Sequence, residues 1–289
     1  MNMNNKICLI TGGNAGIGKA TAIGLAKLGA TVILVCKNRI QGEETLKTLS
    51  NISQTNGHKL LLADLSDFDS IRKCANEFEG QFNRLDVLIN NAGVFFTEAQ
   101  FTRNNIEMQF AVNHLAPFLL TQLLMDTLLK SGKARILNLS STSHYFGKIH
   151  FNDLFFEKRN YNGLRAYEQS KLANVLFTYE LSRILADTEI TVNSIDPGRV
   201  NTHIGNKNSS GILKYLWILS KPSLISTEKG AATSIYLATS KEVDGVSGKY
   251  FKKNKVKRSS KRSYDEVIAK RLWHVSIELT GMDKLKIRK

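Results

Sequence analysis

Short apolar segments alternate with longer helix-like segments along most of the chain. The apolar segments lie at 6–10, 31–35, 59–63, 85–89, 134–139 and 189–195, with a weaker one near Tyr250. None alternates apolar with polar residues over its whole length, which is typical of strands that helices cover on both faces. Helical periodicity fills the intervals at 18–28, 40–50, 66–78, 105–129 and 165–186. This order predicts an α/β fold, a doubly wound parallel sheet with helices on both faces.

Length and composition fit one globular domain. The chain has 289 residues, and its three prolines are scattered, so we expect residues 1–289 to form a single domain. With 42% hydrophobic and 22% charged residues, a disordered or collagen-like chain is excluded. The three cysteines and six histidines show no spacing of a disulfide framework or a metal site, so we expect no metal. The polar start and the lack of a long apolar run favour a cytoplasmic location.

A glycine-rich turn follows the first predicted strand and leads into the first predicted helix. Gly12 permits a tight turn, Gly16 lets the backbone approach a pyrophosphate, and Gly18 lets the helix pack against the strand. The helix N-terminus adds free N–H groups and the positive end of the helix dipole. A glycine turn alone is weak evidence, because it also occurs as a simple C-cap. Its place between a strand and a helix favours dinucleotide binding.

Three motifs occur together in the chain: Gly-x-x-x-Gly-x-Gly at 12–18, Asn-Asn-Ala-Gly at 90–93 and Tyr-Glu-Gln-Ser-Lys at 167–171. In this order they resemble the short-chain dehydrogenase/reductase family, and the resemblance extends from residue 6 to about residue 281. The long interval between Ser141 and Tyr167 is similar to that of the retinol-dehydrogenase-like branch. The resemblance implies a Rossmann-type sheet, a nicotinamide cofactor and a Tyr/Lys-based site of hydride transfer. The cofactor-binding residues it implies here are Gly12, Asn14, Gly16, Ile17, Gly18, Asn91, Ala92 and Gly93.

The end of the second predicted strand bears on the choice of nucleotide. An acidic residue there would bind the adenosine ribose and repel a 2′-phosphate, but Cys36 and Lys37 occupy the place. Because a cation neutralises a 2′-phosphate through charge-assisted hydrogen bonds, we expect NADP(H) to be preferred over NAD(H), with Lys37 on the phosphate. The alternative is that Lys37 is a solvated side chain. Asp64 resembles the family's aspartate beside the adenine, with Leu65 as its apolar neighbour; a helix N-cap is the alternative for Asp64.

Tyr167 and Lys171 lie four residues apart in a helical pattern, which places them on one face of a helix, one turn apart. A free phenol has a pKa of about 10, and a neighbouring ammonium favours the phenolate. We therefore expect Lys171 to lower the pKa of Tyr167 toward the range of general acid–base catalysis and to bind the nicotinamide ribose. Ser141, at the end of the fifth predicted strand, would bind the substrate oxygen, and the resemblance selects it over Ser140.

Asn113 lies in an apolar helical pattern four residues before Pro117, whose missing N–H leaves the Asn113 carbonyl without its helical partner. The resemblance places the fourth catalytic residue here, with a water on that carbonyl linking Lys171 to solvent. A plain proline kink is the alternative. After the sixth predicted strand, the resemblance implies a turn against the nicotinamide formed by Pro197, Gly198 and Thr202.

Aromatic residues cluster near these motifs. The family's substrate lid corresponds to about 200–227, where the segment 211–219 is apolar and aromatic. Further candidates for the lining are Phe95, Phe96, Tyr145, Phe146, Phe151, Phe155 and Phe156. We expect a hydrophobic carbonyl or alcohol as substrate, such as a retinoid, steroid or lipid aldehyde. Core packing is the alternative for about half of these aromatic residues.

The chain carries a formal net charge of +15, and eight basic residues without an acid lie at 249–262. They belong to what we interpret as a basic C-terminal extension at about 249–289. A solvated loop explains this segment, and weak peripheral association with an anionic membrane is the alternative. No fold signature predicts nucleic-acid binding.

The leading hypothesis is an NADP(H)-dependent oxidoreductase in which a hydride passes between nicotinamide and substrate while Tyr167 transfers a proton and Ser141 orients the oxygen. A non-catalytic nucleotide-binding redox sensor or scaffold on the same fold is the alternative, although such proteins typically lose the Tyr or the Lys. A third hypothesis is a protein that binds membranes or nucleic acid through its basic segment. The predicted helices 105–129 and 165–186 are apolar around most of their circumference, which favours a homodimer or tetramer.

Overall fold

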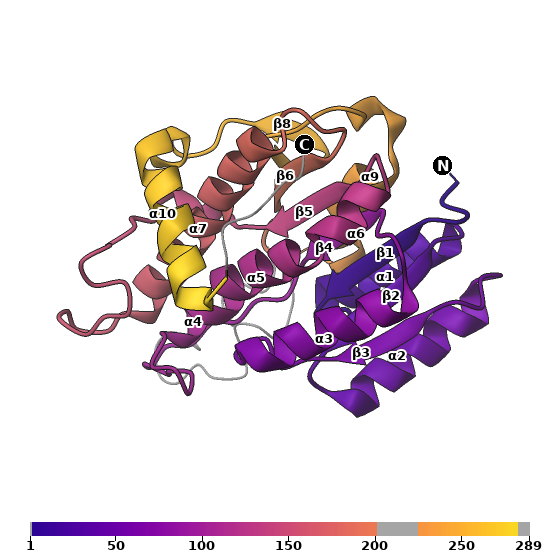
Figure 1. Ribbon diagram of the computed structural model, residues 1–289, viewed down its shortest axis with the longest axis horizontal. Helices are drawn as coiled ribbons and strands as arrows, with labels where there is room; N and C mark the ends of the chain where they lie inside the picture. The colour runs from indigo at the N-terminus through magenta and orange to yellow at the C-terminus, as the bar shows by residue number, and fades with distance from the viewer. Residues whose placement is uncertain (1, 201–224, 283–289) are drawn as a thin grey trace.

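The computed structural model describes residues 2–200 and 225–282, and these form one eight-stranded sheet (Figure 1). The strand order is β3-β2-β1-β4-β5-β6-β7-β8, parallel except for β8, which is antiparallel to β7. The strands are β1 (Ile7–Thr11), β2 (Thr31–Cys36), β3 (Lys59–Leu62), β4 (Val87–Asn90), β5 (Arg135–Leu139), β6 (Thr191–Asp196), β7 (Lys249–Lys252) and β8 (Lys255–Lys257). The predicted α/β fold is confirmed.

Helices cover both faces of this sheet (Figure 1). They are α1 (Gly16–Lys27), α2 (Arg39–Ile52), α3 (Phe68–Gln81), α4 (Met108–Phe110), α5 (Ala116–Leu123), α6 (Met125–Lys130), α7 (Gly163–Ile184), α9 (Thr227–Thr239) and α10 (Glu266–Thr280). Successive strand residues point to opposite faces, so Leu9 belongs to the core shared with α3, α5, α6, α7 and α10, whereas Ile10 belongs to the core shared with α1, α2 and α9. Two buried faces explain why the strands read as continuous apolar segments. None of the described helices is long and apolar enough to cross a membrane.

The strand order reverses between β1 and β4, which pair with each other in the middle of the sheet. In doubly wound sheets, ligands bind in the crevice outside the carboxyl ends of the strands at such a reversal. The glycine turn leaves β1 at this point, and Asn91–Gly93 leaves β4 beside it. Both motifs therefore reach the same edge of the sheet.

The helix predicted over 105–129 is divided. After α4, residues Ala111–Leu115 form a π-helical turn, in which the Ala116 N–H donates to the Ala111 carbonyl, and α5 and α6 follow. Pro117 lies in the first turn of α5, so the expected kink takes the form of this π-helical turn. Asn113 is fully buried in the middle of the turn.

Residues 249–282 are an integral part of the domain, so our interpretation of this segment as a basic extension is corrected. Strand β7 pairs with β6 inside the sheet, and α10 lies across α7 (Figure 1, yellow). Sequence reasoning also missed β8, α9 and α10. The predicted substrate lid at about 200–227, with Thr202 and the segment 211–219, lies almost wholly outside the described residues.

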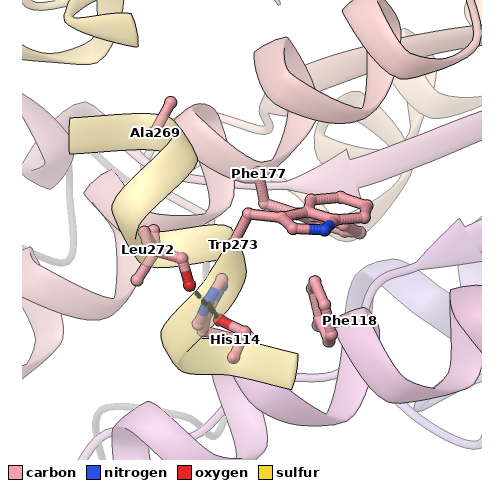
Figure 2. A pocket seen from close by; sticks show the side chains of 7 residues that line it. His114, Phe118, Phe177, Ala269, Leu272 and Trp273 are labelled. Carbon is pink, nitrogen blue, oxygen red and sulfur yellow. Dashed lines mark hydrogen bonds between the residues drawn. The ribbon is translucent and has the colours of Figure 1, made fainter. Parts of the chain in front are cut away.

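Helix α10 covers the apolar faces of α5 and α7. The Trp273 ring lies 5.0 Å from that of Phe118 and 6.0 Å from that of Phe177, centroid to centroid (Figure 2). His114 and Ser276 hydrogen-bond beneath it, with 2.9 Å between Nε2 and Oγ. The apolar circumference from which we expected a homodimer or tetramer is thus covered within the chain. That pattern no longer argues for an oligomer.

Candidate active site

Close backbone contacts shape the glycine turn after β1. Gly12, with φ +65°, and Gly16, with φ +53°, adopt left-handed conformations that favour glycine. A Cβ on Gly18 would collide with the Gly12 carbonyl oxygen and with the side-chain nitrogen of Asn91. That nitrogen donates to the Thr11 carbonyl at 2.7 Å. The turn after β4 is thereby joined to the glycine turn.

The N-terminus of α1 opens onto this turn. Ala15 is the N-cap, and among the described residues no side chain caps this helix. Asn14 donates to Gln41 at 2.9 Å, and Ile17 lies against Gly230 at the start of α9. The first amides of α1 and the positive end of its dipole therefore form a suitable site for an anion such as a pyrophosphate.

Lys37 and Asp64, predicted to contact different parts of the adenosine, form an ion pair of 2.6 Å between the ends of β2 and β3. The Lys37 side chain is 75% exposed, and Asp64 also accepts from the Ser66 hydroxyl at 2.7 Å. Burial acts to raise the pKa of Asp64, but the hydrogen bonds from Lys37 and Ser66 outweigh it, so the pKa is lowered. Asp67 caps α3, and Leu65 packs against the core on the face of the sheet that α3 covers.

Tyr167 and Lys171 lie one turn apart on α7, facing the end of β5. The Lys171 ammonium donates to the Leu139 carbonyl at 3.3 Å and lies 5.4 Å from the centroid of the Tyr167 ring. A Cβ on Gly93 would be 3.4 Å from Lys171 Nζ and 3.3 Å from Asn113 Oδ1. The lysine, Asn113 and the turn after β4 therefore meet at the edge of the sheet.

Asn113 joins α7 to the turn after β4. Its Nδ2 donates to the Val94 carbonyl and to the Ser170 hydroxyl, both at 3.0 Å, and its Oδ1 accepts from the Val94 amide at 2.7 Å. The side chain thus holds three neighbours in place. The predicted proton path through the Asn113 carbonyl stays a prediction.

The two adjacent serines after β5 point to different partners. The Ser140 hydroxyl donates to the Lys171 carbonyl at 2.8 Å and is buried. The Ser141 hydroxyl instead donates to the Ser143 hydroxyl at 3.3 Å and lies close enough to the Tyr167 phenol to lower its pKa. It also accepts from the Ser143 amide at 3.2 Å. Ser141 is therefore the serine that accompanies the tyrosine.

Burial dominates the electrostatics of this group. Burial raises the pKa of Tyr167 to about 12, the hydrogen bond from Ser141 opposes the rise, and the charge of Asp196 adds to it. Burial lowers the pKa of Lys171 to about 8. The expected lowering of the phenol pKa by Lys171 does not appear in this structure, because burial raises the pKa of Tyr167 and the Lys171 ammonium donates to the Leu139 carbonyl. The phenol is protonated at neutral pH.

Comparison with known proteins decides the family. The family model described as short chain dehydrogenase matches residues 6–212. The chain belongs to the short-chain dehydrogenase family. It is 41% identical to human (Homo sapiens) retinol dehydrogenase 13, over 98% of this chain and 87% of that protein. It is 42% identical to mouse (Mus musculus) retinol dehydrogenase 12, over 96% of this chain and 87% of that protein.

Solved structures agree with this assignment. A Mycobacterium paratuberculosis protein is 30% identical with a TM-score of 0.78, covering 98% of this chain and 96% of its own. The Pseudomonas aeruginosa RhlG/NADP active-site complex is 25% identical with a TM-score of 0.69, covering 86% and 95%. As a short-chain dehydrogenase of the retinol-dehydrogenase-like branch, the protein is an oxidoreductase that acts on alcohol or carbonyl groups with a nicotinamide cofactor.

Only some of the aromatic residues predicted to line the substrate pocket lie at this dehydrogenase site. The Phe95 ring lies edge-on to that of Tyr167, with 5.5 Å between centroids. Tyr145 donates to the Arg258 carbonyl, and Phe146 is 68% exposed. Three others pack within the long segment between Ser141 and α7 (the insertion) or against neighbouring helices: Phe151 on Arg271, Phe155 on Phe110 and Phe156 on Tyr161. These three have structural roles.

Sequence reasoning missed a buried polar cluster that holds this insertion. Glu107 caps α4 and accepts from the Tyr161 hydroxyl at 3.0 Å, and burial raises the pKa of its carboxyl. The Gln109 amide donates to the carbonyls of Phe96 and Gly163, at 3.3 and 2.9 Å. Two polar residues in an apolar stretch were the available signal, since buried polar groups need partners. The cluster fixes the start of α7 next to the turn after β4.

Proposed function

We propose that this protein is an NADP(H)-dependent oxidoreductase that transfers a hydride between nicotinamide and the carbonyl or alcohol group of a hydrophobic small molecule. The observation that carries the proposal is the meeting of Ser141, Tyr167 and Lys171 beside Gly93, at the edge where the strand order reverses. The proposal includes a cytoplasmic location, and cell fractionation tests it.

The residues at this edge fit a dinucleotide. The turn from Gly12 to Gly18 brings the first amides of α1, which no described side chain caps, to this edge, where they can bind a pyrophosphate. Gly93 lets the turn after β4 pass close to Lys171, whose ammonium is our candidate for binding a ribose hydroxyl. When bound there, the nicotinamide supplies or accepts the hydride.

The side chains account for the proton and the substrate oxygen. In reduction, the protonated Tyr167 phenol donates to the oxygen that becomes the alcohol, and the Ser141 hydroxyl holds that oxygen. Lys171, with a pKa of about 8, returns a proton toward the tyrosine. Asn113 fixes α7 against the turn after β4. Alcohol oxidation uses the same groups in reverse.

Replacing the tyrosine gives the deciding test. Tyr167→Phe should reduce turnover by roughly 100-fold or more, because the proton donor is lost. NADPH affinity, measured by fluorescence titration, should stay at the wild-type value. Tyr236→Phe, which removes a hydroxyl bonded to Glu242 at the surface, is the matched control.

Retained turnover in Tyr167→Phe would refute the catalytic role. A wild-type protein that binds NADPH but turns over no carbonyl compound would favour the non-catalytic sensor or scaffold instead. Detection of wild-type turnover with any alcohol or carbonyl excludes that alternative.

The NADP(H) preference is supported by the residues at the end of β2. Cys36 occupies the place of an acidic residue and is buried, while the Lys37 ammonium is exposed at the rim. A 2′-phosphate there would compete with Asp64 for this ammonium. The solved relative from Pseudomonas aeruginosa is an NADP complex.

Lys37→Ala tests this preference through the ratio of kcat/KM with NADPH to kcat/KM with NADH. The ratio should fall about 10-fold, because one charge-assisted hydrogen bond contributes roughly 1.5–3 kcal/mol. Lys47→Ala, which removes an exposed lysine of α2 away from the end of β2, should leave the ratio unchanged. An unchanged ratio in Lys37→Ala would contradict the assignment.

A hydrophobic substrate is supported by the relatives, which are named retinol dehydrogenases, and by the contact of Phe95 with Tyr167. A screen of NADPH oxidation over retinoid, steroid and long-chain aldehydes tests it, with small polar aldehydes for comparison. Higher kcat/KM for the polar set would overturn this part of the proposal.

A further inference from the structure

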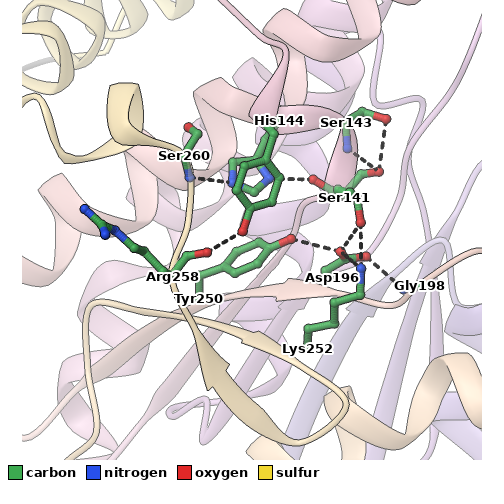
Figure 3. A network of polar contacts seen from close by, with 11 residues as sticks. Ser141, Ser143, His144, Asp196, Gly198, Tyr250, Lys252, Arg258 and Ser260 are labelled. Atoms are coloured by element: carbon green, nitrogen blue, oxygen red, sulfur yellow. Dashed lines mark hydrogen bonds and ion pairs between the residues drawn. The ribbon is translucent and has the colours of Figure 1, made fainter.

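A buried carboxylate lies beside the turn that carries Ser141. Asp196, at the end of β6, is 2% exposed. Figure 3 labels three of the residues that donate to it, Gly198, Tyr250 and Lys252. Among the described residues, four groups donate to this carboxylate: Thr142 Oγ1 at 2.5 Å, the Gly198 amide at 2.8 Å, and Tyr250 Oη and Lys252 Nζ at 2.9 Å each.

These donors come from three separate strand ends. Thr142 directly follows Ser141 after β5, Gly198 belongs to the turn after β6, and Tyr250 and Lys252 lie on β7. Lys252 also donates to the Thr142 hydroxyl at 2.7 Å, which leaves the hydroxyl hydrogen free to point at the carboxylate. The Asp196 side chain thus connects the turn after β5 that carries Ser141 and Thr142 (the serine turn), the Pro197–Gly198 turn and β7.

We propose that Asp196, held by Lys252, is a positioning residue that fixes the catalytic Ser141 relative to the Pro197–Gly198 turn. The inference rests on the proposed function, because Ser141 and that turn are the parts of the site that would contact the substrate oxygen and the nicotinamide. Asp196 acts through Thr142 and Gly198. It is therefore not a catalytic residue.

The charge of Asp196 makes this role measurable. Burial acts to raise the pKa of Asp196, but hydrogen bonds from Thr142 and Lys252 outweigh it, so the carboxyl is ionised at neutral pH. Its negative charge raises the pKa of Tyr167, and the Lys252 ammonium partly neutralises it. The other titratable groups around the pair are Tyr167 on α7, His144 and Tyr145 on the serine turn, and Tyr250 on β7.

Two substitutions that remove charges of opposite sign give the test. Asp196→Asn removes the negative charge in a side chain of the same shape, so the pKa of Tyr167 should fall by about one pH unit. Lys252→Met leaves the carboxylate unbalanced, so that pKa should rise by a similar amount. Lys255→Met, an exposed lysine on β8, is the control and should change nothing.

Two readouts are compared. The first is the pH dependence of kcat/KM in both reaction directions. The second is the ionised fraction of Tyr167 at high pH, from ¹³C NMR of tyrosine-labelled protein with Tyr167→Phe for assignment. The NMR readout needs no substrate. Absence of turnover in the wild type would refute the proposed function, while the NMR shifts would still decide this inference.

Thr142→Val separates positioning from charge. It removes one hydrogen bond but leaves the Asp196–Lys252 pair, so kcat should fall about 10-fold with an unchanged pH profile. A second readout that needs no turnover is the ¹³Cβ shift of Ser141 in serine-labelled protein, which should differ between Thr142→Val and the wild type.

Shifts of the Tyr167 pKa in the same direction for Asp196→Asn and Lys252→Met, or no shift in either, would overturn the inference. A wild-type kcat in Thr142→Val, or an unmoved Ser141 signal, would also overturn it. Thermal unfolding checks that each variant folds. If Asp196→Asn does not, Lys252→Met and Thr142→Val decide the matter.

Discussion

The two turns that form the site are held in place by different means. The glycine turn after β1 depends on backbone contacts, in which Gly18 lies against Gly12 and Asn91. The serine turn after β5 depends on buried side chains, with Asp196 and Lys252 bonded to Thr142. The first turn should therefore respond to the volume of a side chain, and the second to charge and hydrogen bonding.

The largest effect is expected from added volume at the glycine turn. Gly18→Ala should weaken NADPH binding by about 2–3 kcal/mol, or roughly 100-fold, because its Cβ meets backbone that cannot yield. Isothermal titration calorimetry measures the affinity. Wild-type affinity in this variant would show that the turn adapts, and the contrast between the two turns would disappear.

A smaller effect is expected at His144, which holds the serine turn from its other side. Its Nδ1 bonds with the Ser141 carbonyl at 2.7 Å, and its Nε2 accepts from the Ser260 amide at 3.1 Å (Figure 3). Nδ1 therefore carries the proton, and the ring is neutral. His144→Phe keeps the aromatic packing on Tyr250 but loses both bonds, so kcat should fall roughly 10-fold with unchanged NADPH affinity.

His144→Asn is the matched variant for this prediction. Its amide places a donor near the position of Nδ1, so it should recover part of the kcat that His144→Phe loses. Equal kcat values in the two variants would mean that the bond to the Ser141 carbonyl has no positioning role.

Acid should affect the fold on the side of α7 through His114. Burial lowers the pKa of His114 to about 3, so the neutral ring stabilises the fold above its unfolded pKa of about 6.5. This stability is lost as the pH falls from 6.5 toward 3, at about 1.4 kcal/mol per pH unit. His114→Gln should remove this contribution. Between pH 7.5 and 5.5, the free energy of unfolding should therefore fall by about 1.4 kcal/mol less in His114→Gln than in the wild type.

Urea unfolding at the two pH values measures this difference. His274→Gln, on the exposed side of α10, removes a histidine without removing a buried group, and should keep the wild-type dependence. The same pH dependence in His114→Gln and wild type would contradict the prediction.

The smallest effect is expected for a glycine with no close neighbour. A Cβ on Gly80, near the end of α3, would meet nothing within 4 Å. Gly80→Ala should stabilise the protein by about 0.5–1 kcal/mol in thermal unfolding, with no change in NADPH affinity. Destabilisation here would show that volume alone does not explain the effect of Gly18→Ala.

The sequence predicted the glycine turn better than the serine turn for a physical reason. The turn from Gly12 to Gly18 is local, so its residues and their spacing lie within one strand–turn–helix unit. Asp196 and Lys252 are distant in the chain, and their contact exists only after β7 pairs with β6. Lys252 appeared as one of eight basic residues in a segment that we took for a solvated loop.

The spacing of Tyr167 and Lys171 predicted their geometry but not their pKa values. It predicted correctly that the two side chains share one face of a helix. It could not show how far burial removes both groups from water, and that loss sets the pKa of each. Helix α10 was missed in the same way, since the partners of Trp273 on α5 and α7 become visible only in the fold.

Strand β8 has a consequence for how the molecule behaves in concentrated solution. It is short and runs against β7, and Lys255 and Lys257 project from it into water around Val256. Strands with open hydrogen-bonding edges recruit strands from other molecules, and clustered positive charge discourages that stacking. The outermost strand on this side thus protects the rest of the sheet from aggregation.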